Sequence, residues 1–251
     1  MTLRRLLPDL AETTPLEQYT RLGLGAMAPA DRPYVVTNFV TSLDGRATLR
    51  GRAGALGSAL DKEVLHVLRT QADAVMIGAG TMRAECYGRL VPDPELRGLR
   101  ERQEGLAHDP LAVIVTRSLD LPWDCSLFSG GWGRVLIATS SDEEIPKLET
   151  ATRVWRFDDP VDPELLLQRL RSERGVKALL CEGGPHTHSQ LFERHLLDEL
   201  FVTLAPKLAG GSGPNLIEGA LEEEGQLEQV WVCEGEGGEL FTRYRVAPGG
   251  D

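Results

Sequence analysis

The chain has 251 residues, of which 41% are hydrophobic and 26% are charged, and its formal net charge is −11 at pH 7. These proportions are typical of a globular protein and do not suggest a disordered one. The negative charge argues against a general nucleic-acid binder, because such binding depends on lysines and arginines that neutralise phosphates. A small anionic ligand remains compatible with it.

Other features of the composition favour a cytoplasmic protein. The four cysteines, Cys86, Cys125, Cys181 and Cys233, form no CxxC pair, which disfavours a zinc site or a redox dithiol and predicts reduced thiols. No apolar run approaches the roughly 18 residues of a membrane span. Residues 1–10 also lack the apolar core of a signal peptide.

The first predicted elements are an arm, a strand and a helix. Residues 1–33 contain scattered leucines and prolines, which predicts an irregular N-terminal arm ahead of a main domain at 34–251. Residues 34–41 are rich in β-branched and aromatic side chains and predict a strand. Ser58 precedes apolar positions at approximately helical spacing and stands with Asp61 in the arrangement of a capping box.

A local pattern then occurs twice in the chain. Residues 74–77 and 178–181 are apolar runs without alternation, as expected for strands covered on both faces. Each run ends in a glycine turn, at 78–81 and 182–185, and a helix-like segment follows. Glycines at such a turn let backbone N–H groups approach a phosphate. The repeated pattern therefore predicts an α/β enzyme that holds a phosphorylated ligand.

The remaining elements complete the predicted fold. Residues 86–109 are polar, charged and proline-containing, and they predict a long loop. Helices alternate with strands early in the chain and strands dominate late, so the predicted class is α/β, with a mostly parallel central sheet, an antiparallel C-terminal edge hairpin and helices on both faces. Further strands are predicted at 111–116, 135–139, 153–157, 177–181 and 199–204, helices at 162–174 and 188–195, and the hairpin at 229–233 and 240–246.

The first glycine turn does not match the common nucleotide-binding motifs. Gly78-Ala79-Gly80 begins like a dinucleotide fingerprint, but Arg83 stands where the third glycine should be. No Gly-Lys-Ser/Thr follows, which excludes a P-loop. Two interpretations remain for this turn and its Thr81 hydroxyl, phosphate binding or a tight turn with no ligand.

Glu182, in the second turn, is the more specific feature. A carboxylate at the end of an apolar strand is poorly placed for solvation, so such a group usually has an assigned partner or task. The alternative is a structural carboxylate bonded to backbone amides.

Several other polar residues have two interpretations each. Ser58 is either a helix N-cap or a ligand contact, and Arg69 either complements a helix dipole or contacts the ligand. Arg117 and Ser118 follow a strand, where they either hold an anionic group or form a solvated turn.

The histidines do not point to a metal or to a hydrolase. His186 and His188 lie two residues apart, a spacing that occurs in metal sites, but no third ligand is evident nearby, so no metal is predicted. A Gly-x-Ser-x-Gly motif is absent, which leaves a nucleophilic hydrolase unsupported.

Taken in order, these motifs resemble the reductase of riboflavin biosynthesis, the RibD C-terminal family, whose fold is similar to dihydrofolate reductase. The resemblance covers about residues 33–246 and implies a stand-alone reductase, because the zinc deaminase motifs that often precede this module are missing. It rests on Ser42-Leu43-Asp44-Gly45-Arg46, Ser58 with Leu68-Arg69 and Ala72-Asp73-Ala74, Gly80-Thr81 with Glu85, Glu182-Gly183-Gly184-Pro185, Leu197-Asp198-Glu199-Leu200, Ala205-Pro206-Lys207 and Gly210-Gly211.

The resemblance implies an NADPH-dependent reduction, by a homodimer, of a ribosylamino-pyrimidine 5′-phosphate whose ribosyl group becomes an open ribityl chain. The net charge and the lack of an apolar span predict no nucleic-acid or membrane partner. By the same resemblance Glu182 orients or protonates the sugar, and Asn38 is a second catalytic candidate. The implied substrate contacts are Ser58, Arg69, Arg89 and Glu182. The implied cofactor contacts are Thr41, Gly80, Thr81, Glu85, Arg117, Ser118, Gly183, Gly184, Pro185, His186 and Thr187.

Two positions depart from the family pattern. Arg117 stands where relatives often have a serine near the cofactor's 2′-phosphate, and a guanidinium can also bind phosphate with two hydrogen bonds. Relatives commonly continue after the first turn with Asp-Asp-Pro and a leucine-threonine pair, whereas residues 85–90 here read Glu-Cys-Tyr-Gly-Arg-Leu. Whether the substrate is the deaminated or the diamino pyrimidine is therefore left open.

Two other functions remain as alternatives. One is the reduction of another heterocycle, such as dihydrofolate, because a shared fold does not fix the substrate. The other is a non-catalytic NADP-binding protein, which would not need Glu182 and Arg69.

Overall fold

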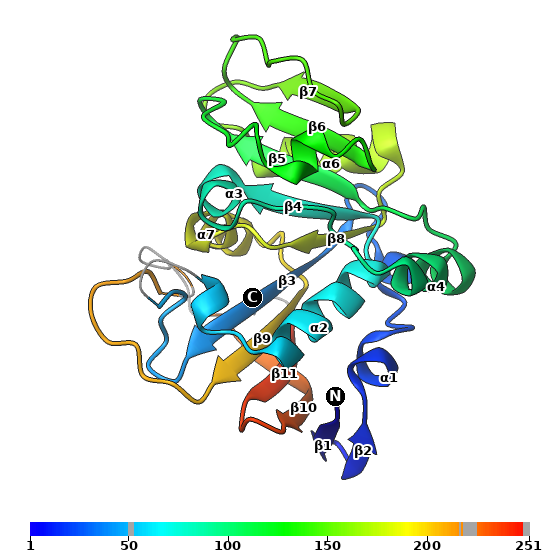
Figure 1. The fold of residues 1–251 in the computed structure, drawn as a ribbon, viewed down its shortest axis with the longest axis vertical. Helices are drawn as coiled ribbons and strands as arrows, with labels where there is room; N and C mark the ends of the chain where they lie inside the picture. The colour runs from blue at the N-terminus through cyan, green and yellow to red at the C-terminus, as the bar shows by residue number, and fades with distance from the viewer. Residues whose placement is uncertain (50–52, 216, 218–224, 248–251) are drawn as a thin grey trace. The chain divides into compact units, whose positions relative to one another are not determined.

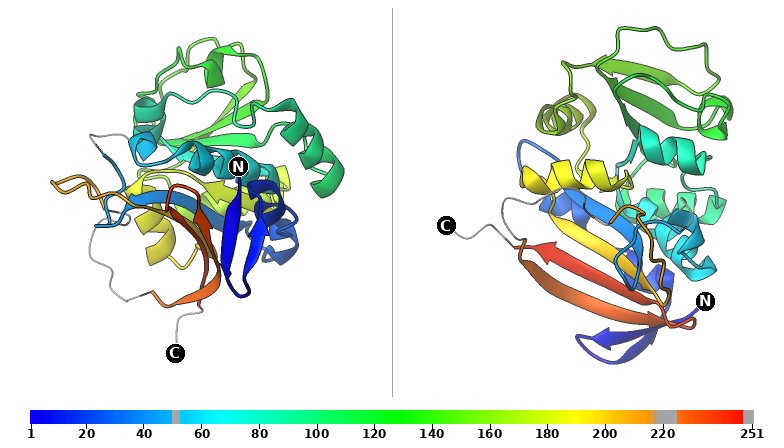
Figure 2. Two further views of the ribbon diagram at one scale, coloured as in Figure 1. Left: turned by 60° about the horizontal axis from the view of Figure 1, so that its bottom comes forward. Right: turned by 90° about the vertical axis from the view of Figure 1, so that its left-hand side faces the viewer.

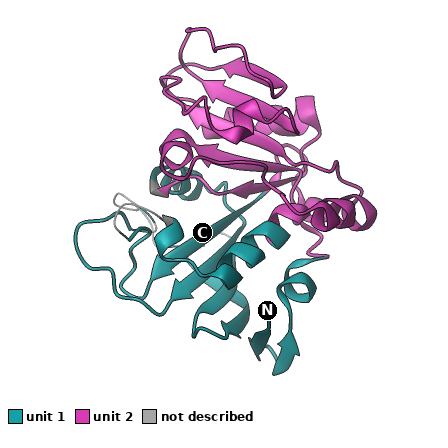
Figure 3. Cartoon of the chain, in the orientation of Figure 1, with its two compact units in different colours: residues 1–20, 35–67, 185–251 teal, residues 21–34, 68–184 magenta. Residues whose placement is uncertain are grey.

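The computed structural model describes residues 1–49, 53–215, 217 and 225–247, and its helices and strands are labelled in Figure 1. Two compact units are present, as Figure 3 shows by colour. Unit 1 comprises Met1–Thr20, Val35–Val67 and Pro185–Asp251, and unit 2 comprises Arg21–Tyr34 and Leu68–Gly184. Each unit is thus assembled from segments that are distant in sequence.

Unit 2 contains a sheet in which all neighbouring strands are parallel. The order of its strands is β8-β4-β5-β6-β7. Ile114 of β5 is in register with Ile77 of β4 and Ile137 of β6, and all three side chains are buried. Burial on both faces explains why these runs show no polar alternation. The strands are β4 (Ala74–Gly78), β5 (Leu111–Thr116), β6 (Arg134–Thr139), β7 (Thr152–Arg156) and β8 (Ala178–Cys181).

Helices lie on both faces of the unit 2 sheet, and Figure 2 shows α6 (Pro163–Arg174) on one side of it and α3 (Ala79–Glu85) with α4 (Pro94–Glu104) on the other. Asp162 caps α6 by accepting hydrogen bonds from two backbone N–H groups, and Gly175 ends it with a left-handed φ of 66°. The shorter elements of this unit are α5 (Ser126–Ser129), η1 (Leu24–Met27) and η3 (Arg69–Gln71).

Unit 1 contains a mixed sheet in the order β2-β1-β10-β11-β9-β3, in which β3 and β9 are parallel and the other neighbours are antiparallel. Tyr19, Phe201 and Trp231 form an aromatic cluster in its core, with ring centroids 5.0 to 6.1 Å apart. The strands are β1 (Leu3–Leu7), β2 (Ala11–Thr13), β3 (Tyr34–Ser42), β9 (Glu199–Ala205), β10 (Leu227–Gly235) and β11 (Leu240–Val246), and the helices are α1 (Pro15–Tyr19), η2 (Ala53–Ala55), α2 (Ala59–Leu68) and α7 (Pro185–Glu193).

The predicted fold class is confirmed. The parallel strands, the C-terminal antiparallel hairpin of β10 and β11, and the helices α2, α6 and α7 all occur where the sequence predicts them, within a few residues. No helix in the described part of the chain combines the length and the apolar character needed to cross a bilayer.

The prediction of a long loop at 86–109 was wrong, because this segment contains α4. Asp93 caps the helix, Pro94 occupies its first turn, and Gly105 ends it with a φ of 66°. The helix has no apolar stripe to reveal it, since its buried residue is Arg100. Hydrophobic periodicity therefore does not predict this helix, whereas the residues that cap its two ends do.

The prediction of an irregular N-terminal arm was also wrong. β1 pairs with β10, with Leu3 opposite Gly235, and β2 pairs with β1. These short strands carry little sequence signal, since Leu3 is the one fully buried residue of β1. Their stability comes from backbone pairing with a strand more than 200 residues away, and a local reading of the sequence cannot detect such pairing.

Candidate functional site

The two glycine turns lie together at the carboxyl edge of the unit 2 sheet. β4 and β8 are neighbouring parallel strands, so the turns that follow them emerge at the same edge. A Cβ atom on Gly184 would lie 3.2 Å from Thr81 Oγ1, which is a close approach. Gly80, in contrast, faces open space. Ligands of α/β proteins commonly bind at this edge.

Arg69 and Glu182 form a buried ion pair in unit 2. Arg69 Nε donates to Glu182 Oε1, and Nη2 donates to Oε2, both at 2.7 Å. The two residues are 6% and 9% exposed. Arg69 Nη1 donates to the backbone oxygen of Leu90 at 2.8 Å, which fixes the guanidinium in place. Glu182 thus has the partner that its position predicts, and the partner is an arginine instead of backbone amides.

Tyr87 completes this cluster and was not among the residues selected from the sequence. Its hydroxyl donates to Glu182 Oε2 at 3.2 Å, and the Arg69 guanidinium lies 5.5 Å from its ring centroid. Burial, and then the negative charge of Glu182, raise the pKa of Tyr87 well above its usual value, so the phenol keeps its proton. Burial acts to lower the pKa of Arg69, but Glu182 outweighs it and the net pKa is raised. The cluster is therefore a carboxylate held by two donors.

Arg89 lies in a different environment. Its guanidinium forms a two-pronged pair with Asp109, at 2.8 and 2.7 Å. Asp109 stands just before β5, so this pair belongs to the amino end of that strand, whereas the glycine turns lie at the carboxyl edge. The structure therefore does not bring Arg89 to Glu182.

Arg117 and Ser118 follow β5 at the carboxyl edge, as predicted. The Arg117 side chain is 79% exposed and forms an ion pair with Asp159. Ser140, after β6, donates its hydroxyl to the backbone oxygen of Arg117 at 3.4 Å. Glu85, at the end of α3, is exposed. This edge thus presents an accessible guanidinium beside hydroxyl groups.

Unit 1 holds the remaining predicted residues. Asn38 lies on β3 opposite Phe201 and is half-buried, and Thr41 is buried near the end of the same strand, where its hydroxyl donates to Arg46 O at 3.2 Å. Ser58 Oγ accepts from the backbone N–H of Asp61 at 3.1 Å, so its role as a helix cap is confirmed. Gly183 and Gly184 belong to unit 2, and α7 of unit 1 begins with Pro185, an exposed His186 and a half-buried Thr187.

Motifs that are far apart in sequence form one hydrogen-bonded network in unit 1. Asp44 accepts from the backbone N–H groups of Ala209 and Gly210, at 2.9 and 2.8 Å. The Ser42 hydroxyl, followed by these two amides, lowers the pKa of Asp44. Arg46 donates to Asn215 Oδ1 at 2.9 Å, and the network continues from Lys207 Nζ to the backbone oxygens of Ala55 and Leu56. This network fixes the turn that follows β3.

The prediction of reduced thiols was wrong for two of the four cysteines. Cys86 and Cys125 form a disulfide, with their Cα atoms 5.5 Å apart, while Cys181 and Cys233 are buried free thiols. Cys86 ends α3 and Cys125 is the N-cap residue of α5. The pair was missed because the two positions are 39 residues apart and belong to no recognisable spacing motif.

No group of three or more His, Cys, Asp or Glu side chains within the described ranges is arranged to hold a metal ion. His188, one of the two histidines considered for such a site, is buried in unit 1 and packs its ring against Phe39, with the ring centroids 3.8 Å apart.

Comparison with known proteins extends these observations. The family model of the RibD C-terminal domain matches residues 33–237. A curated relative from Archaeoglobus fulgidus, a 2,5-diamino-6-ribosylamino-4(3H)-pyrimidinone 5′-phosphate reductase, is 30% identical over 194 residues, which cover 75% of this chain and 87% of the relative.

Longer proteins and solved structures also match. The riboflavin biosynthesis protein RibD of Chlamydia muridarum is 29% identical over 74% of this chain, and the match covers 49% of that protein. The crystal structure of a pyrimidine reductase-like protein from Corynebacterium diphtheriae superposes with a TM-score of 0.77 at 22% identity, covering 94% of this chain and all of the other. The family match, the curated relative and the shared fold agree, and the chain belongs to the RibD C-terminal domain family.

Proposed function

We propose that this protein is an NADPH-dependent reductase of riboflavin biosynthesis, which converts the ribosyl group of a ribosylamino-pyrimidine 5′-phosphate to the ribityl form. Membership of the family supports this proposal, as do the reductase activities by which its curated relatives are named. The observation that carries it is the buried pair of Arg69 and Glu182 in the same unit as the glycine turns. A protein that only bound a nucleotide would not need a carboxylate directly before the second glycine turn, and this place distinguishes Glu182 from the other buried carboxylates.

The proposed reaction balances as a hydride and a proton transfer. Opening of the ribose ring gives an imine between C1′ and the exocyclic nitrogen. A hydride reduces C1′ and a proton from solvent water is added to the nitrogen, so the product is a ribitylamine. When bound, NADPH supplies the hydride, and the protein positions and polarises the sugar.

The described residues fit a dinucleotide at the first turn. Gly78 caps α3 without a side-chain hydrogen bond, so the first N–H groups of the helix are not occupied by a side-chain cap. The open space beside Gly80 leaves room for a pyrophosphate, whereas a side chain on Gly184 would crowd the Thr81 hydroxyl. In this proposal Gly80, Thr81, Gly183 and Gly184 contact the cofactor.

Glu182 orients the substrate in this proposal. A carboxylate that Arg69 holds with two hydrogen bonds is fixed in position, so it is suited to accept a further hydrogen bond from a sugar hydroxyl or the exocyclic nitrogen. We assign Asn38 as a second polar contact to the sugar. The Ser58 hydroxyl already caps α2, so any contact with the substrate must be made in addition to that bond. Arg89 can contact the substrate only after its ion pair with Asp109 opens.

The decisive assay follows the loss of NADPH absorbance with three substrates, namely the diamino and the deaminated ribosylamino-pyrimidine 5′-phosphates and dihydrofolate. We expect turnover with a pyrimidine phosphate and conversion of its sugar to the ribityl form by mass spectrometry. Turnover with dihydrofolate alone would overturn the proposal. The proposal also includes a cytoplasmic location and a homodimeric protein. Sedimentation analysis checks the dimer.

A further inference from the structure

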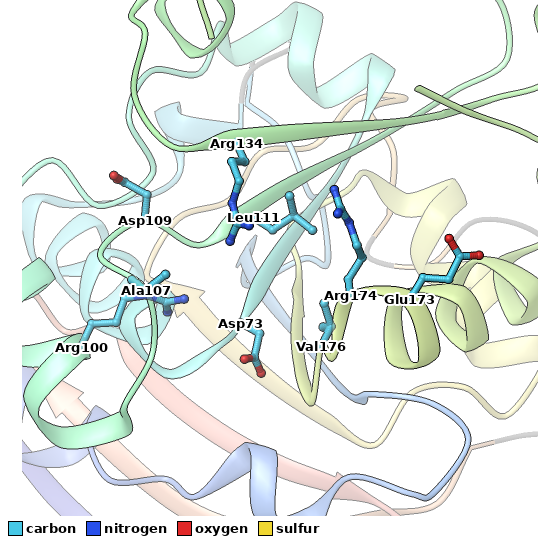
Figure 4. A pocket seen from close by; sticks show the side chains of 9 residues that line it. All are labelled: Asp73, Arg100, Ala107, Asp109, Leu111, Arg134, Glu173, Arg174 and Val176. Carbon is cyan, nitrogen blue, oxygen red and sulfur yellow. The ribbon is translucent and has the colours of Figure 1, made fainter. Parts of the chain in front are cut away.

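A polar pocket of about 190 Å³ lies in unit 2 at the amino edge of its sheet. It is lined at the starts of the strands, by Asp73 before β4, Leu111 of β5, Arg134 of β6 and Val176 before β8. Figure 4 shows three arginine side chains around it, which come from three elements, Arg100 from α4, Arg134 from β6 and Arg174 from the end of α6. The glycine turns, Glu182 and Arg117 of this unit follow the carboxyl ends of the strands, and Arg89 is paired with Asp109, so the predicted contacts leave the arginines of this pocket unexplained.

The acidic residues of the pocket are engaged with other partners. Asp109 holds Arg89 in the two-pronged pair described above. Glu173 accepts from Arg169 at 2.8 Å. Asp73 Oδ2 accepts from the backbone N–H groups of Lys177 and Ala178, at 3.0 and 2.8 Å. The hydrogen bonds of these three carboxylates are therefore made to groups outside the arginine cluster.

The three arginines have no such match. Throughout the described residues, no carboxylate lies within ion-pair distance of Arg100, Arg134 or Arg174. Arg100 is 1% exposed and donates only to backbone oxygens, those of Ala107, Arg69, Thr70 and Ala72. Three guanidinium groups thus face one small pocket without an ion-pair contact to any carboxylate of the described residues.

The pKa values of Arg100 and Arg174 are both lowered, because burial and repulsion outweigh the charges of the carboxylates nearby. Burial lowers the pKa of Arg100 to about 10. Burial, and then the charges of Arg153 and Arg134, lower the pKa of Arg174. A buried charge without a partner is costly, and repulsion within the cluster adds to that cost. An anion in the pocket would relieve both.

We propose that this pocket is a second ligand site, separate from the reductase site, and that it binds a phosphate-type oxyanion, either free phosphate or a phosphomonoester. Planar guanidinium groups match the oxygens of phosphate with paired hydrogen bonds. The carbonyl oxygens of Arg171 and Leu170 at the end of α6, which would repel an anion, accept hydrogen bonds from Gly175 and Val176.

Thermal unfolding with added inorganic phosphate tests the proposal, with chloride at equal ionic strength as the reference. We expect phosphate to raise the melting temperature by about 5 °C when it is far above its Kd. Arg134→Gln and Arg174→Gln should each abolish most of this increase, whereas Arg102→Gln, which removes an exposed arginine of α4 outside the pocket, should retain it.

The melting temperature of the Arg134→Gln variant without phosphate provides a second test of the proposal. Because Arg134 repels Arg174, Arg134→Gln should unfold at the same or a slightly higher temperature in chloride while it loses the phosphate response. Equal phosphate responses in Arg134→Gln, Arg174→Gln and Arg102→Gln would overturn the proposal, as would a wild-type response no larger than that to chloride. Parallel titrations with ribose 5-phosphate distinguish the two sources, since tighter binding than phosphate identifies a phosphomonoester and weaker binding identifies the free ion.

Discussion

Both guanidinium nitrogens that Arg69 directs at Glu182 lie 2.7 Å from a carboxylate oxygen, and neither residue is more than 9% exposed. Such a pair is rigid, so it holds the carboxylate oxygens in fixed positions for whatever binds beside them. Glu182→Gln should therefore lower kcat by at least about 100-fold while the Kd of NADPH stays within a few-fold. Equal losses of turnover and cofactor binding would show that the carboxylate has another role.

A matched control exists for that substitution. Glu199 and Arg243 form another buried pair, at 2.7 Å, in unit 1. Breaking a buried pair by removing one charge costs about 3–5 kcal/mol wherever it lies. Glu199→Gln should therefore destabilise the protein about as much as Glu182→Gln does, but the folded fraction should retain its kcat. Comparison of the two variants separates chemistry from stability.

Arg117 should decide the preference between NADPH and NADH. Its side chain is exposed at the carboxyl edge of the sheet, and its partner is Asp159. Arg117→Ala should raise the KM for NADPH about 10-fold or more and leave the KM for NADH almost unchanged, because only NADPH carries the 2′-phosphate. Steady-state kinetics with both cofactors check this, and a parallel rise of the two KM values would contradict it.

Asp61 should make stability depend on pH. Burial is the largest of several causes that together raise the pKa of this carboxyl from 3.8 to about 6. Between these values the folded protein retains a proton that the unfolded chain has released, so stability falls as pH rises through this window. The total loss is at most about 3 kcal/mol.

Asp61→Asn should therefore unfold at a higher denaturant concentration than the wild type at pH 7. The two proteins should converge near pH 4, where Asp61 is protonated in the folded state. Urea titrations across this range measure the effect. A variant that is less stable than the wild type at pH 7 but not near pH 4 would mean that the charged carboxylate stabilises α2 more than burial penalises it.

The disulfide should contribute to stability through the loop that it closes. Cys86 and Cys125 are 39 residues apart, and closing a loop of this length stabilises a fold by about 3–4 kcal/mol. The double variant Cys86→Ser/Cys125→Ser should lose about this amount and become insensitive to reductant. Thiol titration of the unfolded, unreduced protein should detect two groups, Cys181 and Cys233. Detection of all four would show that the thiols are reduced.

The helices show how far local sequence reasoning reaches. Asp-Pro-Glu-Leu occurs at 93–96 and again at 162–165, and each copy caps and begins a helix that ends at a left-handed glycine. Only the second was predicted, because α6 adds three buried leucines to the caps. α4 buries Arg100 in their place. The capping residues indicated a helix at both places, whereas hydrophobic periodicity indicated only α6.

The sequence predicted several residues of the candidate site but not the contacts between them. Arg69 and Glu182 were both selected from the sequence, but they are 113 residues apart and nothing local indicates that they pair. The pairing arises because β8 lies beside β4, which is a property of the sheet order. Tyr87 and Asp109 were missed for the same reason, since each acquires its role from a distant partner.

The position of the disulfide has a practical consequence for measuring the activity of this protein. Cys86 directly precedes Tyr87, whose hydroxyl bonds to Glu182. Preparations made with and without reductant would thus be different chemical species, which differ in a covalent bond one residue from the tyrosine that contacts Glu182. Kinetic constants obtained in dithiothreitol and in its absence should be compared only after the number of free thiols in each sample has been counted.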